Sequence, residues 1–153
     1  MHRPLRLTCD RAALQANWRW LSATSGTACG AAVKANGYGL GARDAAAALA
    51  EAGCRDFFVA TWAEAAELGP VPGGVAVLHG AGRQDMDAAL ESTARPVLNS
   101  VEQVTRWKTA APCRPCDVMV DTGMNRLGLS AADLGSGLLD GLKIETLMSH
   151  LAC

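Results

Sequence analysis

Short apolar runs alternate with helix-like segments along most of the chain, and successive runs begin roughly 20 to 30 residues apart. Runs that are apolar at nearly every position are typical of parallel strands covered on both faces, and parallel strands need a crossover, usually a helix, between them. The spacing matches a (β/α)8 barrel of about 250 residues divided by eight. The predicted strands cover residues 30–33, 56–60, 75–78, 96–98, 117–120 and 144–148.

Helical periodicity fills the intervals between these strands. The first helix is predicted to begin after the N-cap residue Asp10 and to end before Ser25-Gly26. Thr61, with Glu64 three residues later, has the spacing of a capping box. The remaining helices are predicted at residues 42–52, 61–68, 84–92, 100–109 and 131–139.

The number of strands sets the expected architecture. Six strands are predicted where a barrel requires eight, so we expect one α/β domain over residues 1–153 with about six of the eight strands of a TIM-type barrel. A doubly wound open sheet is the main alternative, but no G-x-G-x-x-G fingerprint follows the first predicted strand. A parallel sheet that stays open exposes unpaired backbone at its edges and is expected to associate.

Charge and hydropathy exclude several classes of partner. The chain carries a formal net charge of -1, and its Lys and Arg residues are scattered, so it lacks the basic stripe that binds nucleic-acid phosphates. The opening segment, residues 1–7, has no apolar core of a signal peptide. No later stretch approaches the ~20 apolar residues of a membrane helix. We therefore expect a cytoplasmic protein that binds neither nucleic acid nor a membrane.

The spacing of Cys113 and Cys116, C-x-x-C, is that of a redox or zinc motif. A single pair is weak support for zinc, and the pair precedes a predicted strand, whereas a thioredoxin-type pair opens a helix. Without an export signal, the six cysteines are expected to remain thiols. We interpret this segment as a loop and predict no metal site.

Lys34 ends the first predicted strand and is followed by the glycine-rich segment Ala35-Asn36-Gly37-Tyr38-Gly39. Active sites of (β/α)8 barrels form where strands end and βα loops begin. A lysine in an apolar setting loses stabilisation of its charged form, and it then serves as a nucleophile that forms a Schiff base. An ordinary lysine reaching solvent from a strand end is the alternative interpretation.

Two further segments stand at predicted strand ends. Asp121-Thr122-Gly123-Met124-Asn125-Arg126-Leu127-Gly128 places an arginine between two glycines, and arginine forms forked bonds to carboxylate or phosphate. Ser149-His150 places a histidine at the end of the sixth strand. His79 ends the third strand and is given no role. Taken singly, each pattern is more often a turn or a structural residue than a site.

In this order and at this spacing, the three segments resemble alanine racemase. The barrel of that family binds pyridoxal 5'-phosphate (PLP); it opens with a sequence like A-V-V-K-A-N-A-Y-G-H-G and later carries D-T-G-M-x-R-L-G and then S-H. The matching segments here are residues 32–41, 121–128 and 149–150, and residues 7–10 and 16–17 are similar to the family's opening strand and helix. The resemblance spans essentially the whole chain and implies a PLP-binding barrel.

The resemblance implies roles for four residues. Lys34 would hold PLP covalently and act as the base on one face of the substrate Cα. Tyr38 would hydrogen-bond the cofactor phosphate, and Arg126 would lie near the cofactor's phenolic oxygen and the substrate carboxylate. His150 would support an arginine, expected beyond Cys153, that contacts the pyridine nitrogen. The parent protein would interconvert L- and D-alanine for peptidoglycan and would be a homodimer.

The resemblance also shows what this chain does not supply. Met119 stands where some family members carry a carbamylated lysine that orients the arginine, so Arg126 would need another partner or none. The second base and the carboxy-terminal β domain are expected outside the chain, which makes racemisation by these 153 residues doubtful. A non-catalytic PLP-binding barrel and an inert remnant remain as alternatives, and alanine is not distinguished from serine as substrate.

Overall fold

The structure is a computed structural model that describes residues 8–151; the opening segment 1–7 and residues 152–153 lie outside the described residues. One parallel sheet runs through it, with its six strands in chain order and each paired with the next; the β5–β6 pairing has a register shift between Cys116 and Asp117. The strands are β1 (Ala31–Ala32), β2 (Asp56–Val59), β3 (Gly74–Val77), β4 (Arg95–Leu98), β5 (Pro115–Val120) and β6 (Lys143–Ser149).

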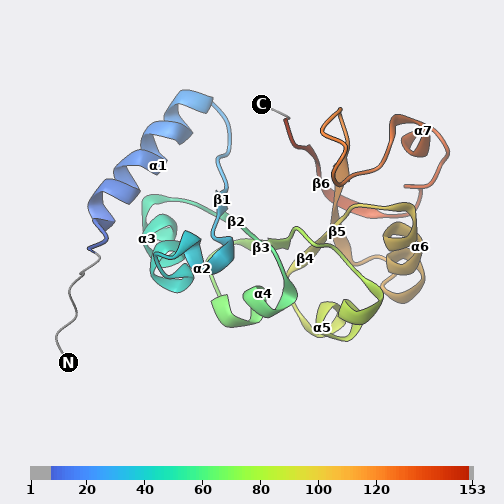
Figure 1. Ribbon diagram of the computed structural model, residues 1–153, viewed down its shortest axis with the longest axis horizontal. Coiled ribbons are helices and arrows are strands. Elements are labelled where there is room, and N and C mark those ends of the chain that lie inside the picture. Colours follow the sequence, from blue (N-terminus) through green and yellow to red (C-terminus); the bar gives the residue numbers. More distant parts are fainter. Residues whose placement is uncertain (1–7, 152–153) are drawn as a thin grey trace.

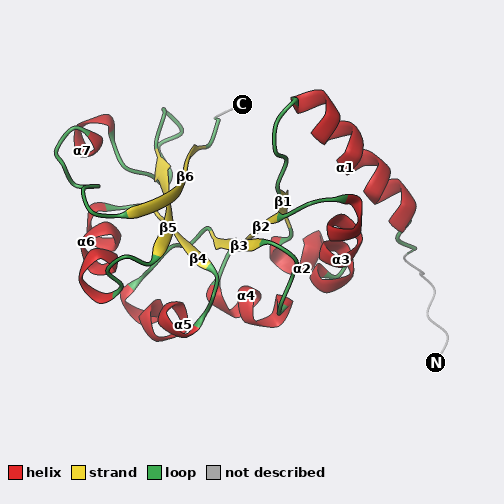
Figure 2. Ribbon diagram, turned by 180° about the vertical axis from the view of Figure 1, so that it is seen from behind, coloured by secondary structure: helices red, strands yellow, loops and turns green. Residues whose placement is uncertain are grey.

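Helices connect the strands and lie along one side of the curved sheet (Figures 1 and 2). They are α1 (Arg11–Ser25), α2 (Lys34–Tyr38), α3 (Ala42–Ala52), α4 (Trp62–Leu68), a 3-10 turn η1 (Arg83–Asp85), α5 (Met86–Glu91), α6 (Val101–Ala110) and α7 (Ala131–Leu134). The side chains of Asp10, Thr61 and Ser100 accept hydrogen bonds from the first turns of α1, α4 and α6. The predicted N-cap at Asp10 is therefore confirmed.

Three local predictions were only partly right. The helix expected over 131–139 ends at Leu134, because Gly135 follows at once and Gly137 and Gly141 adopt positive φ angles of 76° and 80°. The helix expected over 84–92 begins with the tight turn η1 and continues as α5. The capping box expected at Thr61 forms only in part: Thr61 accepts from the Glu64 amide, but the Glu64 carboxylate binds other amides.

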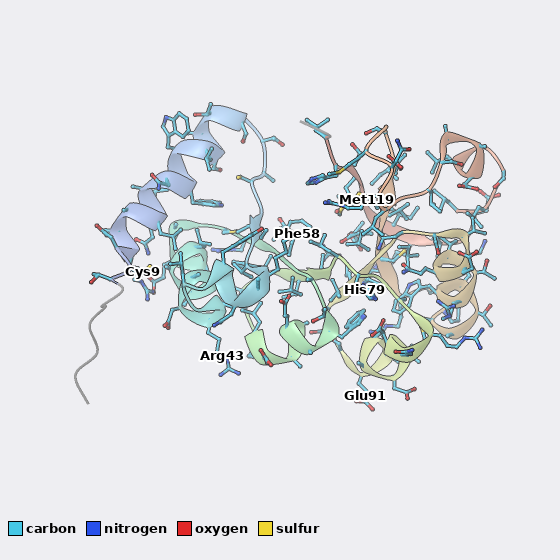
Figure 3. The ribbon with its side chains drawn as sticks, viewed as in Figure 1. Cys9, Arg43, Phe58, His79, Glu91 and Met119 are labelled. Atoms are coloured by element: carbon cyan, nitrogen blue, oxygen red, sulfur yellow. The ribbon has the colours of Figure 1, made fainter. Side chains whose placement is uncertain are left out.

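The core has two layers, one on each face of the sheet. The larger layer lies between the sheet and its helices and includes Phe57, Val77, Leu98, Val118 and Trp107, all buried. The smaller layer lies on the opposite face. Figure 3 shows two of its members, Phe58 and Met119. Alternation of side chains along each strand separates the two layers.

The sheet does not close on itself. Among residues 8–151, β1 pairs only with β2 and β6 only with β5, and most of β6 is exposed. Among residues 8–151, no helix covers the other side of the sheet between β1 and β6 (Figures 1 and 2). The expected incomplete barrel, with six of eight strands, is confirmed.

A charged pair lies on the same face of the sheet as the smaller core layer. Asp117 is fully buried, and the Arg95 Nε atom lies 3.3 Å from each of its carboxylate oxygens. Burial raises the pKa of Asp117, and the neighbouring guanidinium opposes that rise. Arg95 also lies directly over Gly74, where an added Cβ would meet the guanidinium at 2.6 Å. The Arg95–Asp117 pair thus lies on the face of the sheet opposite the helices, near the amino-terminal ends of β3 and β4.

Candidate functional site

Three of the four residues predicted from the sequence line one cavity. Lys34, Arg126 and His150 border a space of about 270 Å³ at the carboxyl ends of the strands. The rest of the lining is apolar or weakly polar, apart from His79, and holds no carboxylate. It consists of Ala60, Thr61, Leu78, His79, Met119, Met124 and Leu127. A cavity with four basic side chains and no acidic one suits an anionic ligand.

Lys34 begins a left-handed turn rather than ending a strand. β1 stops at Ala32, and after the buried Val33 the backbone enters α2, where Ala35, Asn36 and Tyr38 have φ angles of 51°, 52° and 55°. Left-handed backbone costs a non-glycine residue roughly 1–2 kcal/mol, so surrounding contacts must hold this turn. The half-buried Lys34 side chain is thereby placed at the cavity.

Tyr38 lies apart from the cavity. Its side chain is 64% exposed, and the residue does not line the space that Lys34 and Arg126 share. The turn that carries Lys34 leaves Tyr38 on its outer side, facing solvent. The contact between Tyr38 and a cofactor phosphate stays a prediction.

The loop that carries Arg126 is held by its own backbone and by the Asp121 carboxylate. One oxygen of Asp121 accepts from the amides of Gly123, at 2.9 Å, and of Asn125, at 3.1 Å. These bonds, the Gly123 bond first, lower the pKa of Asp121. The loop is closed where the Asp121 amide donates to the Leu129 carbonyl at 3.0 Å. Arg126 is exposed on this closed loop.

A second connection ties the Arg126 loop to the strand β4. The Asn99 carbonyl accepts from the Gly128 amide at 3.2 Å, and the Asn99 side-chain amide donates to the carbonyls of Leu78, at 2.8 Å, and Val97, at 2.7 Å. Asn99 is almost fully buried. It therefore holds the ends of β3 and β4 and the Arg126 loop in one arrangement. Asn99 was not predicted from the sequence, although it directly follows the buried strand β4.

Met119 lines the cavity. It stands at the position where the family resemblance implies a carbamylated lysine in some members. Its side chain is buried in the smaller core layer and is an apolar part of the cavity lining. No ion pair involves Arg126 within residues 8–151. The Arg126 guanidinium is therefore left without a protein carboxylate in the described part of the chain.

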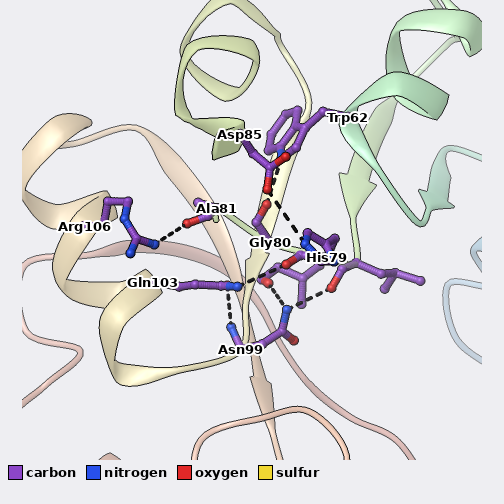
Figure 4. A network of polar contacts seen from close by, with 10 residues as sticks. Trp62, His79, Gly80, Ala81, Asp85, Asn99, Gln103 and Arg106 are labelled. Carbon is purple, nitrogen blue, oxygen red and sulfur yellow. Dashed lines mark hydrogen bonds and ion pairs between the residues drawn. The ribbon is translucent and has the colours of Figure 1, made fainter. Parts of the chain in front are cut away.

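His79 belongs to the cavity, although no role was predicted for it from the sequence. Its Nε2 atom lies 3.9 Å from an Asp85 carboxylate oxygen, and its carbonyl accepts from the Gln103 side chain at 3.1 Å. The loop after β3 is fixed further by Trp62 and Arg106, which donate to the carbonyls of Gly80 and Ala81 (Figure 4). His79 lies two residues after the end of β3, as Lys34 lies two residues after the end of β1.

The C-x-x-C segment does not form a paired site. Cys113 is exposed in a turn, whereas Cys116 is buried in β5, where its thiol contacts the Lys143 carbonyl. Burial raises the pKa of the Cys116 thiol to about 11. Within residues 8–151 no group of three or more His, Cys, Asp or Glu residues is placed to hold a metal ion. Nor does any helix in that range combine the length and apolar character needed to cross a membrane.

Comparison with known proteins identifies the family. Residues 9–153 match the family described as "Alanine racemase, N-terminal domain". The chain belongs to the alanine racemase N-terminal domain family. The family resemblance noted from residues 32–41, 121–128 and 149–150 is thereby confirmed.

Relatives in this family are similar over nearly the whole chain. An alanine racemase of Cereibacter sphaeroides (strain ATCC 17025 / ATH 2.4.3) is 43% identical over 154 residues, and one of Rhizobium meliloti (strain 1021) is 44% identical over 159 residues. These alignments cover 96% and 97% of this chain but only 44% and 42% of the relatives. The chain thus spans less than half the length of the curated relatives it matches.

Solved alanine racemases share the fold. The crystal structure from Bartonella henselae, described as having covalently bound pyridoxal phosphate, has a TM-score of 0.83 and 36% sequence identity, and the match covers 94% of this chain and 44% of that one. The structure from E. faecalis has a TM-score of 0.86 at 27% identity, covering 98% of this chain and 44% of that one. The six-stranded sheet therefore corresponds to part of the fold of these two structures.

Proposed function

We propose that this chain is the PLP-binding part of an alanine racemase and that Lys34 is the residue that holds the cofactor. The observation that carries the proposal is the single cavity shared by Lys34, Arg126 and His150. Family membership supports it, as does the covalently bound pyridoxal phosphate described for the Bartonella henselae relative. No comparison favours the non-catalytic PLP-binding barrel.

The chemistry of the cavity lining fits PLP. An amine is needed for covalent attachment, and Lys34 supplies it at the cavity wall. PLP is an anion, and Arg126, His79 and His150 offer donors in a lining without carboxylates. Apolar side chains for the flat ring come from residues 78, 119, 124 and 127. The residues present therefore match the charge and the polarity of the cofactor.

Each of the four residues would have its own role in binding or in proton transfer. PLP, when bound, supplies the electron sink that makes the substrate Cα proton removable. Lys34, once free, would take or return that proton on one face of the Cα. Arg126 would bind the substrate carboxylate, and because no protein carboxylate neutralises it within residues 8–151, its full charge is available. Tyr38 and His150 would hold the phosphate and support an arginine, respectively.

Racemisation needs a proton donor on each face of the Cα, and Lys34 is the candidate base that lines this cavity. We propose that the second base, the remaining barrel strands and a carboxy-terminal β domain belong to parts of the protein outside these 153 residues, and that the whole protein acts as a homodimer in the cytoplasm. The relatives' greater length supports the first point.

Covalent trapping tests the cofactor assignment. The chain is mixed with PLP, reduced with borohydride and mapped by peptide mass spectrometry. We expect the pyridoxyl group on Lys34 in preference to the other two lysines, Lys108 and Lys143, which serve as internal references. Lys34→Ala should abolish the selective label, whereas Lys108→Ala should retain it. Equal labelling of all three lysines would show that Lys34 forms no special site.

Assay of a longer protein tests the reaction itself. A version extended through the remaining strands and the β domain should convert L-alanine to D-alanine, followed by a D-specific oxidase assay. Lys34→Ala in that protein should lose racemisation entirely, because one face of the Cα would lack its base. Absence of racemisation of any amino acid, despite bound PLP, would overturn the assignment.

A further inference from the structure

The Glu64 carboxylate joins the end of β1 to the end of β2. One of its oxygens accepts a hydrogen bond from the Ala35 amide at 2.8 Å, and the other accepts from the Ala60 amide at 2.6 Å. Glu64 itself stands in the first turn of α4, where its own amide donates to the Thr61 hydroxyl. A single side chain from the second βα unit thus holds the residue that directly follows Lys34.

The chain around Lys34 has few other ties to its neighbours. β1 has only two residues, and the Val33 amide, which donates to Phe58, makes its last backbone bond to β2. The bonds that follow lie within the turn or within the segment that continues it, such as the Gly37 amide to the Val33 carbonyl and the Ala42 amide to the Asn36 side chain. Within the described residues, one side-chain hydrogen bond reaches this turn from another βα unit, and Glu64 supplies it.

This tie is made where the backbone is strained. Ala35 is the first of the residues with left-handed φ, and it is not a glycine. Residues in such conformations persist only where surrounding structure holds them. A carboxylate that accepts the Ala35 amide fixes the peptide between Lys34 and Ala35, and this peptide sets the direction in which the Lys34 side chain leaves the backbone.

We propose that Glu64 is a positioning residue for Lys34: its carboxylate, shared between the Ala35 and Ala60 amides, holds the left-handed turn that directs the Lys34 amine into the cavity. The inference rests on the proposed function, because its consequence is read at the cofactor lysine. Charge by itself does not explain the arrangement. Glu67, one turn later on α4, carries the same charge, but within residues 8–151 its carboxylate accepts no hydrogen bond; only its carbonyl does, from the Arg43 side chain.

The test compares Glu64→Gln with Glu67→Gln in the full chain. Glutamine keeps the shape of Glu64 but replaces one acceptor oxygen by an amide donor, which would face a backbone N–H. Hydrogen bonds to charged groups contribute enough that losing one should weaken PLP trapping at Lys34 by about tenfold or more. Labelling of Lys108 and Lys143 should stay unchanged. Glu67→Gln removes the same charge from the same helix and should label Lys34 as the unmodified chain does.

A measurement without cofactor accompanies the trapping. Amide hydrogen exchange of the peptide covering residues 34–41 should become at least about tenfold faster in Glu64→Gln, because the turn opens locally, and should not change in Glu67→Gln. Should Glu64→Gln fail to fold, Glu64→Asp replaces it. That variant keeps the charge, but its side chain is one methylene too short to reach both amides. We therefore expect the same weaker PLP trapping at Lys34 and the same faster exchange of residues 34–41.

The outcomes separate the two proposals. If the unmodified chain shows no preference for Lys34, the cofactor assignment fails. If Lys34 is preferred and Glu64→Gln or Glu64→Asp labels and exchanges like the unmodified chain, the positioning role is overturned. Equal losses in Glu64→Gln and Glu67→Gln would indicate an effect of helix charge and would also overturn it.

Discussion

Replacement of Arg95 by Met is expected to lower the free energy of unfolding by about 3 to 5 kcal/mol near neutral pH, because it leaves a buried carboxylate without its partner. Asp117 is fully buried, and Arg95, at 3.3 Å, is its charged neighbour. Urea unfolding followed by circular dichroism measures the loss. Lys143→Met, which breaks an exposed pair with Glu145, should have little effect.

The loss in the Arg95 variant should depend on pH. Burial raises the pKa of Asp117 above its unfolded value, so the folded state holds this proton to higher pH than the unfolded state. The stability linked to that proton is present below the unfolded pKa and is lost as pH rises through the folded pKa. Without Arg95 the pKa of Asp117 rises further, so the destabilisation should be larger at pH 7 than at pH 5.

Two results would contradict this account of the buried pair. One is a loss in Arg95→Met that is the same at both pH values. The other concerns the double variant Arg95→Met with Asp117→Leu, which replaces both charges by apolar groups and should recover most of the stability. If the double variant is as unstable as the single one, Arg95 contributes through packing rather than through its charge.

Gly128→Ala is expected to disrupt the Arg126 loop. Gly128 has a φ of 133°, and an added Cβ would stand 2.7 Å from the Val120 carbonyl carbon and closer still to the Asp121 amide nitrogen. Backbone atoms in a closed loop cannot move aside cheaply, so we expect a loss of about 3 kcal/mol or more in unfolding free energy. Because the loop carries Arg126, PLP trapping at Lys34 should also weaken.

Gly123→Ala in the same loop is the matched control. Gly123 also has a positive φ, of 124°, but an added Cβ there would meet nothing within 4 Å. Gly123→Ala should therefore lose only the free energy of the strained backbone, of order 1–3 kcal/mol. Its effect on PLP trapping should be smaller than that of Gly128→Ala. Equal effects of the two substitutions on stability and trapping would mean that the close approach of Gly128 to Asp121 does not hold the loop.

The site was partly predictable because parallel strands all end at the same edge. Lys34, Arg126 and His150 follow three apolar runs, and the topology alone brings the ends of such runs together. His79 also follows a strand and lines the cavity, but a single histidine at a strand end has no distinguishing sequence signal. Residues such as Glu64 and Asn99 act through backbone amides and carbonyls, whose partners sequence spacing does not reveal.

The sequence by itself determined the alternation of strands and helices, the six-stranded count and the family, because apolar periodicity and ordered motifs are local properties of the chain. Tertiary structure alone decided the left-handed turn after Lys34, since non-glycine residues adopt that backbone only when contacts such as those of Glu64 hold it. It also decided that the Glu64 carboxylate does not complete the predicted capping box, because it accepts instead from the Ala35 and Ala60 amides, which follow β1 and β2.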